Sequence, residues 1–97
     1  MKKANSNLAI KLKEFDNIVS EMRATLIAKN NDYGNSNIIF LGLKGTFVRI
    51  WDKVSRLKSL VWESKEVKVK EETIEDTLKD LANYAIISLI VKRGKWR

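Results

Sequence analysis

The chain has 97 residues, 44% of them hydrophobic, and a formal net charge of +7, which predicts one small domain whose surface attracts anionic partners. It contains no cysteine and no histidine, which excludes thiol nucleophiles, disulfides, imidazole acid–base catalysis and the usual zinc ligands. Any catalysis would have to use carboxylates, lysine, tyrosine or a metal held by oxygen atoms.

No targeting or membrane segment is expected. The opening Met1-Lys2-Lys3 has no apolar segment behind it, as a signal peptide would require. No uninterrupted apolar run approaches the roughly 18 residues that a membrane-spanning helix needs. The chain is therefore expected to be soluble and cytoplasmic, with no membrane partner.

The first predicted helix covers residues 6–29. Asn5 to Asn7 offer N-cap side chains, and the turn formers between Asn30 and Asn35 end the helix near Lys29. Its apolar residues alternate four and three apart, as they do along one side of a helix: Leu8, Leu12, Phe15, Val19, Met22 and Leu26.

The second predicted helix covers residues 45–62. The charged segment that follows it suits a short extended connector, because Val67 and Val69 alternate with lysines. One side of this helix is apolar, and we expect it to face the core. It carries Phe47, Ile50, Val54, Leu57 and Val61, with Trp51 at its edge.

The third predicted helix covers residues 73–92. Thr73 and Asp76 have the spacing of a capping box, and Gly94 is a typical helix stop before the basic tail of residues 93–97. The expected core side carries Ile74, Leu78, Leu81, Ala85 and Leu89. The sequence thus predicts an all-α fold, a small helical bundle of three main helices forming a single domain over residues 1–97.

Two polar stripes lie away from these apolar sides, and both become apolar further along. Leu60 continues the stripe of the second helix, and Ile87 and Val91 continue that of the third. A face that is only solvated should not change in this way within two turns. We therefore expect both helices to be covered on two sides, and the bundle to be completed by oligomerisation. The stripes comprise Arg49, Asp52, Lys53 and Arg56 on one helix and Glu72, Asp76, Asp80 and Tyr84 on the other.

Simpler roles fit the same residues. The charged stripe of the second helix can consist of surface ion pairs, and Asp76 can serve only the capping box. Asn83 and Tyr84 can close the core with hydrogen-bonded polar ends. For the basic tail with Trp96, a solvated end is favoured over contact with nucleic acid, which is not expected as a partner.

Three ordered segments resemble the nucleotide-modification-associated domain family, whose small members are common in phages and are encoded near nucleotide-metabolism genes. The resemblance spans about Lys29 to Ala85, and it implies a nucleotide ligand. If the chain is phage-encoded, it implies the cytoplasm of an infected bacterium as its location. The segments are Asn31-Asp32-Tyr33-Gly34, Arg49-x-x-Asp52-Lys53-x-x-Arg56-Leu57 and Glu72-Thr73-x-x-Asp76-Thr77-Leu78-x-Asp80-Leu81-Ala82-Asn83-Tyr84-Ala85.

The helical layout is also similar, more distantly, to the all-α nucleoside-triphosphate pyrophosphatases of the MazG type. Those enzymes gather four acidic residues on two helices around magnesium ions. Here Asp52 stands alone among the cations of the second helix. A cationic helix opposite acidic residues suits direct binding of phosphate oxygens better than a two-metal cluster.

The favoured hypothesis is a protein that binds a phosphorylated nucleotide without turnover and without a cofactor, for example as a phage sponge for a host defence signal. Cyclic and modified nucleotides are included among the candidate ligands. Tyr33 would stack on a base, and Asn31 and Asn35 would contact its polar edges. The remaining expected ligand-binding residues are Asp32, Arg49, Asp52, Lys53, Arg56, Asp76, Asp80 and Tyr84. A homo-oligomer would form the site between chains.

The main alternative is a magnesium-dependent nucleotide hydrolase of the MazG type. Glu72, Asp76 and Asp80 would then hold the metal, with Asp52 completing its ligands or positioning water. Lys53 and Arg56 would stabilise charge on the leaving phosphate. The residues leave open whether the chain is an enzyme, although they favour a binding protein.

Overall fold

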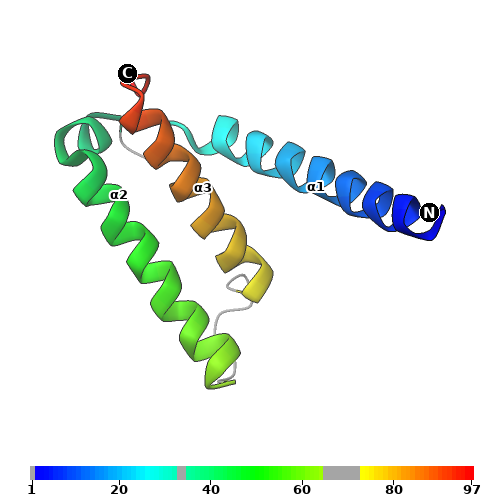
Figure 1. Cartoon of the computed structure of the whole chain (residues 1–97). Helices are drawn as coiled ribbons and strands as arrows, with labels where there is room; N and C mark the ends of the chain where they lie inside the picture. The colour runs from blue at the N-terminus through cyan, green and yellow to red at the C-terminus, as the bar shows by residue number, and fades with distance from the viewer. Residues whose placement is uncertain (1, 33–34, 65–72) are drawn as a thin grey trace. The chain divides into compact units, whose positions relative to one another are not determined.

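The computed structural model describes residues 2–32, 35–64 and 73–97, which contain three main helices (Figure 1). The helices are α1, Lys2–Lys29; α2, Asn35–Leu57, which continues as the short π-helical η1, Lys58–Trp62; and α3, Ile74–Lys92. No strand occurs in these three stretches, so the prediction of an all-α fold with three main helices is confirmed. No helix in them is long and apolar enough to cross a bilayer.

The chain divides into two compact units, Met1–Asn30 and Asn31–Arg97. The first unit is α1, which ends at Lys29 as predicted but begins at Lys2. Asn5 to Asn7 are therefore helical and the predicted N-cap is wrong, because the lysine and alanine residues before them favour helix. The apolar stripe of α1 is largely exposed to solvent at Leu8, Leu12, Phe15 and Val19, whereas Met22 is buried.

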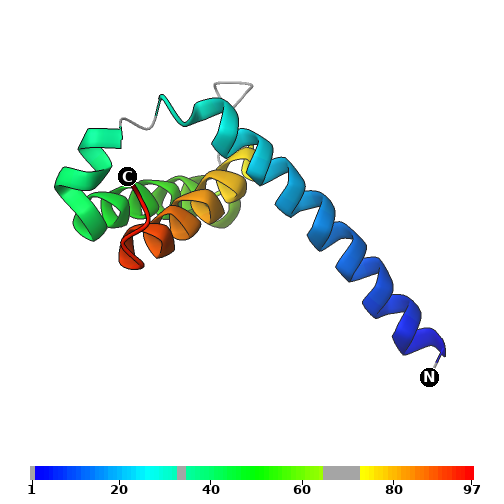
Figure 2. The ribbon, with the colours of Figure 1, turned by 90° about the horizontal axis from the view of Figure 1, so that it is seen from above.

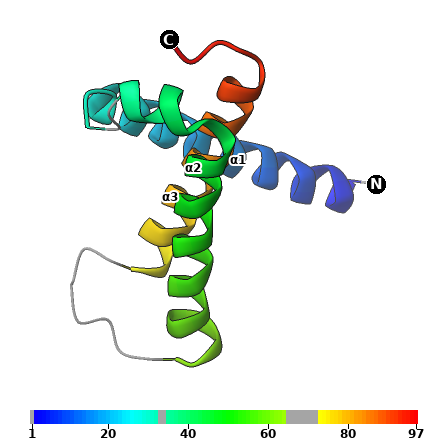
Figure 3. The same cartoon turned by 90° about the vertical axis from the view of Figure 1, so that its left-hand side faces the viewer.

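Helix α2 begins ten residues before its predicted start and contains a break. Gly42 has φ 59° and ψ −142°, a conformation that residues with a side chain rarely adopt. The chain therefore changes direction between residues 35–41 and the longer part of α2 (Figure 3). The early start follows from the apolar run Ile38 to Leu41, which has no helix breaker before Gly42. The predicted end at Trp62 is confirmed by η1.

Helix α3 matches its prediction closely. Thr73 is the N-cap, and its hydroxyl oxygen accepts a hydrogen bond from the Asp76 N–H at 3.0 Å. Asp76 Oδ2 accepts from the Thr73 N–H at 3.4 Å, which completes the capping box. At the other end Gly94 has φ 69°, and the Lys95 N–H donates to the Ile90 carbonyl at 3.0 Å. The predicted stop at Gly94 is confirmed.

Helices α2 and α3 lie side by side and antiparallel in the second unit (Figures 1 and 2). The predicted connector with Val67 and Val69 lies outside the described residues. Fully or almost fully buried residues on the two helices and on η1 are Thr46, Leu60, Thr77, Asn83 and Ile87. These positions continue the polar stripes, so the stripes of the two helices face each other.

Most residues of the apolar sides that we expected to form the core are exposed instead, whereas Ile50, Leu57 and Leu81 are half-buried. On α2 and η1 the exposed residues are Phe47, Trp51, Val54 and Val61, and on α3 they are Ile74, Leu78 and Leu89, with exposed fractions between 42% and 60%. The prediction therefore placed the core on the wrong side of both helices. Helical periodicity separates two sides of a helix, but it does not show which side meets the neighbouring helix.

Candidate functional site

A cavity of about 140 Å³ lies in the second unit, between the bent start of α2 and the middle of α3. Residues from three separate parts of this unit contribute to it: the turn before α2, α2 itself and α3. Its lining consists of Asp32, Ile38, Leu41, Gly45, Thr46, Arg49 and Tyr84.

Two glycines allow α2 to form one wall of the cavity. The break at Gly42 lets Ile38 and Leu41, before it, line the same space as Thr46 and Arg49, after it. Gly45 permits a close approach, because a Cβ atom at this position would lie 2.5 Å from Leu41 Cβ. A side chain at residue 45 would therefore displace Leu41 and change the shape of the cavity.

The polar groups of the cavity differ in exposure. Thr46 is 3% exposed, and its hydroxyl donates a hydrogen bond to the Leu43 carbonyl at 3.2 Å. Tyr84 is half-buried, whereas Arg49 and Asp32 are exposed. The cavity thus combines a buried hydroxyl and a half-buried phenol with an accessible guanidinium and an accessible carboxylate.

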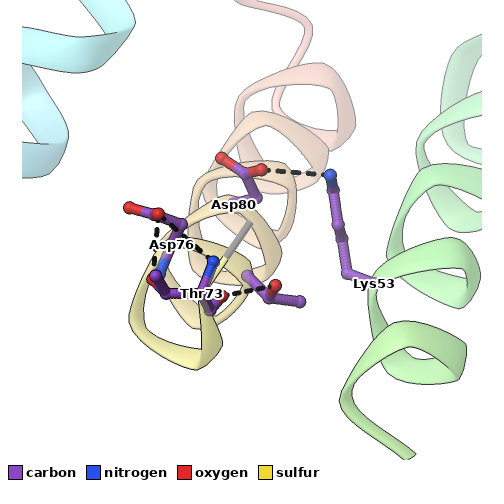
Figure 4. Close-up of polar contacts among 5 residues, drawn as sticks. Lys53, Thr73, Asp76 and Asp80 are labelled. Atoms are coloured by element: carbon purple, nitrogen blue, oxygen red, sulfur yellow. Dashed lines mark hydrogen bonds and ion pairs between the residues drawn. The ribbon is translucent and has the colours of Figure 1, made fainter. Parts of the chain in front are cut away.

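An ion pair joins α2 and α3 one helical turn beyond Arg49. Lys53 Nζ lies 3.0 Å from Asp80 Oδ2, and both side chains are partly exposed (Figure 4). In Figure 4 the carboxylate of Asp80 points toward Lys53, whereas that of Asp76 turns back onto Thr73. The two polar stripes therefore meet within a single chain.

The other predicted site residues whose side chains the structure describes do not line the cavity. Asn31 is exposed in the turn before α2, Asp52 is exposed on α2, and Arg56 is half-buried near the end of α2. Asp76 takes part in the capping box. Tyr33, Glu72 and the side chain of Asn35 lie outside the described part of the structure. Three predicted residues, Asp32, Arg49 and Tyr84, line the same cavity.

Four lining residues were not predicted from the sequence: Ile38, Leu41, Gly45 and Thr46. One signal for them was present. Gly42 and Gly45 stand three residues apart in an otherwise helical and apolar segment, and glycines in such a place often have a conformational or packing reason.

The described carboxylates are distributed rather than clustered. Within residues 2–32, 35–64 and 73–97, no three acidic side chains are grouped so that they could hold a metal ion together. Asp76 contacts Thr73 and Asp80 contacts Lys53, so these two have different partners although they lie one turn apart.

The comparison with known protein families agrees with the resemblance seen in the sequence. The model of the family described as nucleotide modification associated domain 1 matches residues 29–91, which include every residue that lines the cavity. No curated protein and no solved structure gave a match, and the similarity to the MazG type stays a prediction. Since the matched segment makes up most of the chain, this protein belongs to the nucleotide modification associated domain 1 family.

Proposed function

We propose that this protein binds a phosphorylated nucleotide in the cavity and holds it without turnover. The observation that supports the proposal most directly is the convergence of Asp32, Arg49 and Tyr84. These residues are far apart in the sequence, belong to the three segments of the family pattern, and line one cavity. Membership of a nucleotide-associated family points to the same class of ligand.

Each lining residue has a role that follows from its chemistry. The guanidinium of Arg49 offers paired N–H donors to phosphate oxygens. The carboxylate of Asp32 accepts hydrogen bonds from ribose hydroxyls or base amino groups. Tyr84 offers a ring edge and a hydroxyl, and Ile38 and Leu41 provide the apolar contacts that small-molecule sites commonly contain. Tyr33, Asn31 and Asn35 remain candidates for contacts to the base.

Binding without turnover is favoured by the partners of the acidic residues. In the hydrolase alternative, Asp76 and Asp80 would hold magnesium together with Glu72. Asp76 instead closes the capping box, and Asp80 lies beside a lysine. In a phage-encoded member of the family, such binding would withdraw a signal nucleotide from a host defence system.

The direct test is to incubate the protein with a panel of linear and cyclic nucleotides and magnesium, denature it, and chromatograph the released ligand. Intact ligand that is depleted before denaturation and recovered afterwards supports sequestration. Conversion to a shorter nucleotide would show that the protein is a hydrolase. If every nucleotide stays free, the nucleotide site is refuted.

The variant Arg49→Ala tests whether the guanidinium of Arg49 binds the phosphate of the nucleotide. We expect it to weaken nucleotide binding at least about tenfold, because a charge-assisted hydrogen bond to phosphate is lost. Lys92→Ala removes the same charge from the exposed last turn of α3 and should leave binding within about twofold, since Lys92 is not among the described lining residues and exposed charges are screened by salt. Equal losses in both variants would indicate non-specific attraction by net charge.

We also propose that a second copy of the chain is a partner. The support is the exposed apolar side of α2 and η1, formed by Phe47, Trp51, Val54 and Val61. Contiguous apolar surface of this kind usually marks an interaction site. None of these four residues is among the described lining of the cavity, so a second copy bound on this side would not have to cover the binding site.

A further inference from the structure

The charge of the cavity is nearly balanced. Its described lining includes one cation, Arg49, and one carboxylate, Asp32, and the remaining lining residues are neutral. One guanidinium matches two oxygens of a single phosphate group. Each further phosphate would bring negative charge into a site where the described lining has no second cation for it and where Asp32 repels it.

The next cation on this side of α2 is already neutralised. Lys53 follows Arg49 by four residues, so the two lie one above the other on the helix. Its ammonium group is 3.0 Å from the carboxylate of Asp80. A phosphate chain that extended from Arg49 toward Lys53 would meet Asp80 as well, so the attraction of the lysine would be largely cancelled.

The size of the cavity points in the same direction. Its volume of about 140 Å³ is less than half of the roughly 300 Å³ at which small-molecule pockets commonly begin. A cavity of this size encloses part of a nucleotide and leaves the rest at the exposed edge formed by Arg49 and Asp32. Phosphates beyond the one that Arg49 binds would therefore lie outside the enclosed space and gain no contacts from it.

From these observations we infer that the cavity selects a ligand with a single phosphate group, as in a nucleoside 5′-monophosphate or a cyclic mononucleotide, over nucleoside di- and triphosphates. The inference rests on the proposed function. Arg49 binds the phosphate, Asp32 and Tyr84 contact the nucleoside, and the Lys53–Asp80 pair opposes extension of the phosphate chain.

Isothermal titration calorimetry of the full chain tests this selection. For each of the common bases, the mono-, di- and triphosphate and the 3′,5′-cyclic monophosphate are titrated at one ionic strength with EDTA present. We expect weaker binding for each added phosphate, by up to about fivefold, which is the effect of one unopposed unit of charge at contact distance in water. The affinities of the linear and cyclic monophosphates show which of these two kinds of single-phosphate ligand the cavity prefers.

The outcomes separate the two proposals. Triphosphates that bind as tightly as monophosphates, or more tightly, would overturn the single-phosphate inference and leave nucleotide binding intact. If no nucleotide of any length binds, the proposed function fails and the inference fails with it.

Asp80→Asn tests the role of the ion pair. The substitution removes the carboxylate that neutralises Lys53, so we expect the ratio of triphosphate affinity to monophosphate affinity to rise about fivefold. Glu75→Gln is the control, because Glu75 pairs with Lys79 at 3.3 Å along α3, away from the cavity lining. An unchanged preference in Asp80→Asn, with the helical circular dichroism preserved, would refute this basis for selection.

Discussion

Asp76 and Asp80 have the same chemistry and lie one turn apart on α3, yet they do different things. Asp76 closes the start of the helix by bonding to Thr73, whereas Asp80 joins α3 to α2 through Lys53 (Figure 4). The capping box could be predicted, because it depends on residues three apart in the sequence. The ion pair could not, because it depends on how two helices are placed.

The capping box leads to a prediction about stability. We expect Thr73→Ala to lower the free energy of unfolding by about 1 kcal/mol, since the first turn of α3 loses its side-chain acceptor. Urea unfolding followed by circular dichroism measures the difference. Ser55→Ala, at an exposed position inside α2, removes a hydroxyl that caps no helix. A loss in Ser55→Ala as large as that in Thr73→Ala would contradict the capping role.

The break in α2 explains why only three of the seven described lining residues of the cavity could be predicted from the sequence. Arg49 and Tyr84 were found because they stand at helical spacing among apolar residues. Ile38 and Leu41 were missed because their segment was not predicted to be helical. They line the same cavity as Thr46 because the chain changes direction at Gly42. One backbone conformation, rather than a pattern of side chains, assembles that wall.

Gly42→Ala should therefore affect both stability and binding. Its positive φ makes any side chain unfavourable there by about 1–3 kcal/mol, and relaxation of the strain would move Ile38 and Leu41. Gly94, at the end of α3, also has a positive φ, and at neither glycine would a Cβ atom meet another atom within 4 Å. Gly94→Ala should thus lose comparable stability and keep nucleotide affinity. Calorimetric titration of both variants decides the point; equal affinities would show that the break does not shape the cavity.

At the scale of the whole molecule, most large apolar side chains of the described residues are exposed rather than buried. The buried apolar side chains in the described residues are Met22, Leu60 and Ile87, whereas large apolar side chains on all three helices are exposed. The sequence showed that α2 and α3 each have two sides unsuited to water. It could not show that the polar sides of α2 and α3 would face each other, because the Lys53–Asp80 ion pair forms only once the two helices meet.

The exposed side of α2 is where we expect the second copy to bind. Phe47 and Trp51 form an aromatic pair with ring centroids 6.3 Å apart, and Trp51 is 60% exposed. Large aromatic side chains of this kind commonly anchor protein interfaces.

We expect the wild-type protein to sediment as a dimer or larger oligomer. Trp51→Glu should shift it toward monomer, because the new charge would have to be buried without a partner. Ser55→Glu adds the same charge to α2 at a position outside this apolar set and should leave the oligomer intact. A wild-type chain that sediments as a monomer at every concentration, with cooperative unfolding, would show that these apolar sides need no second copy.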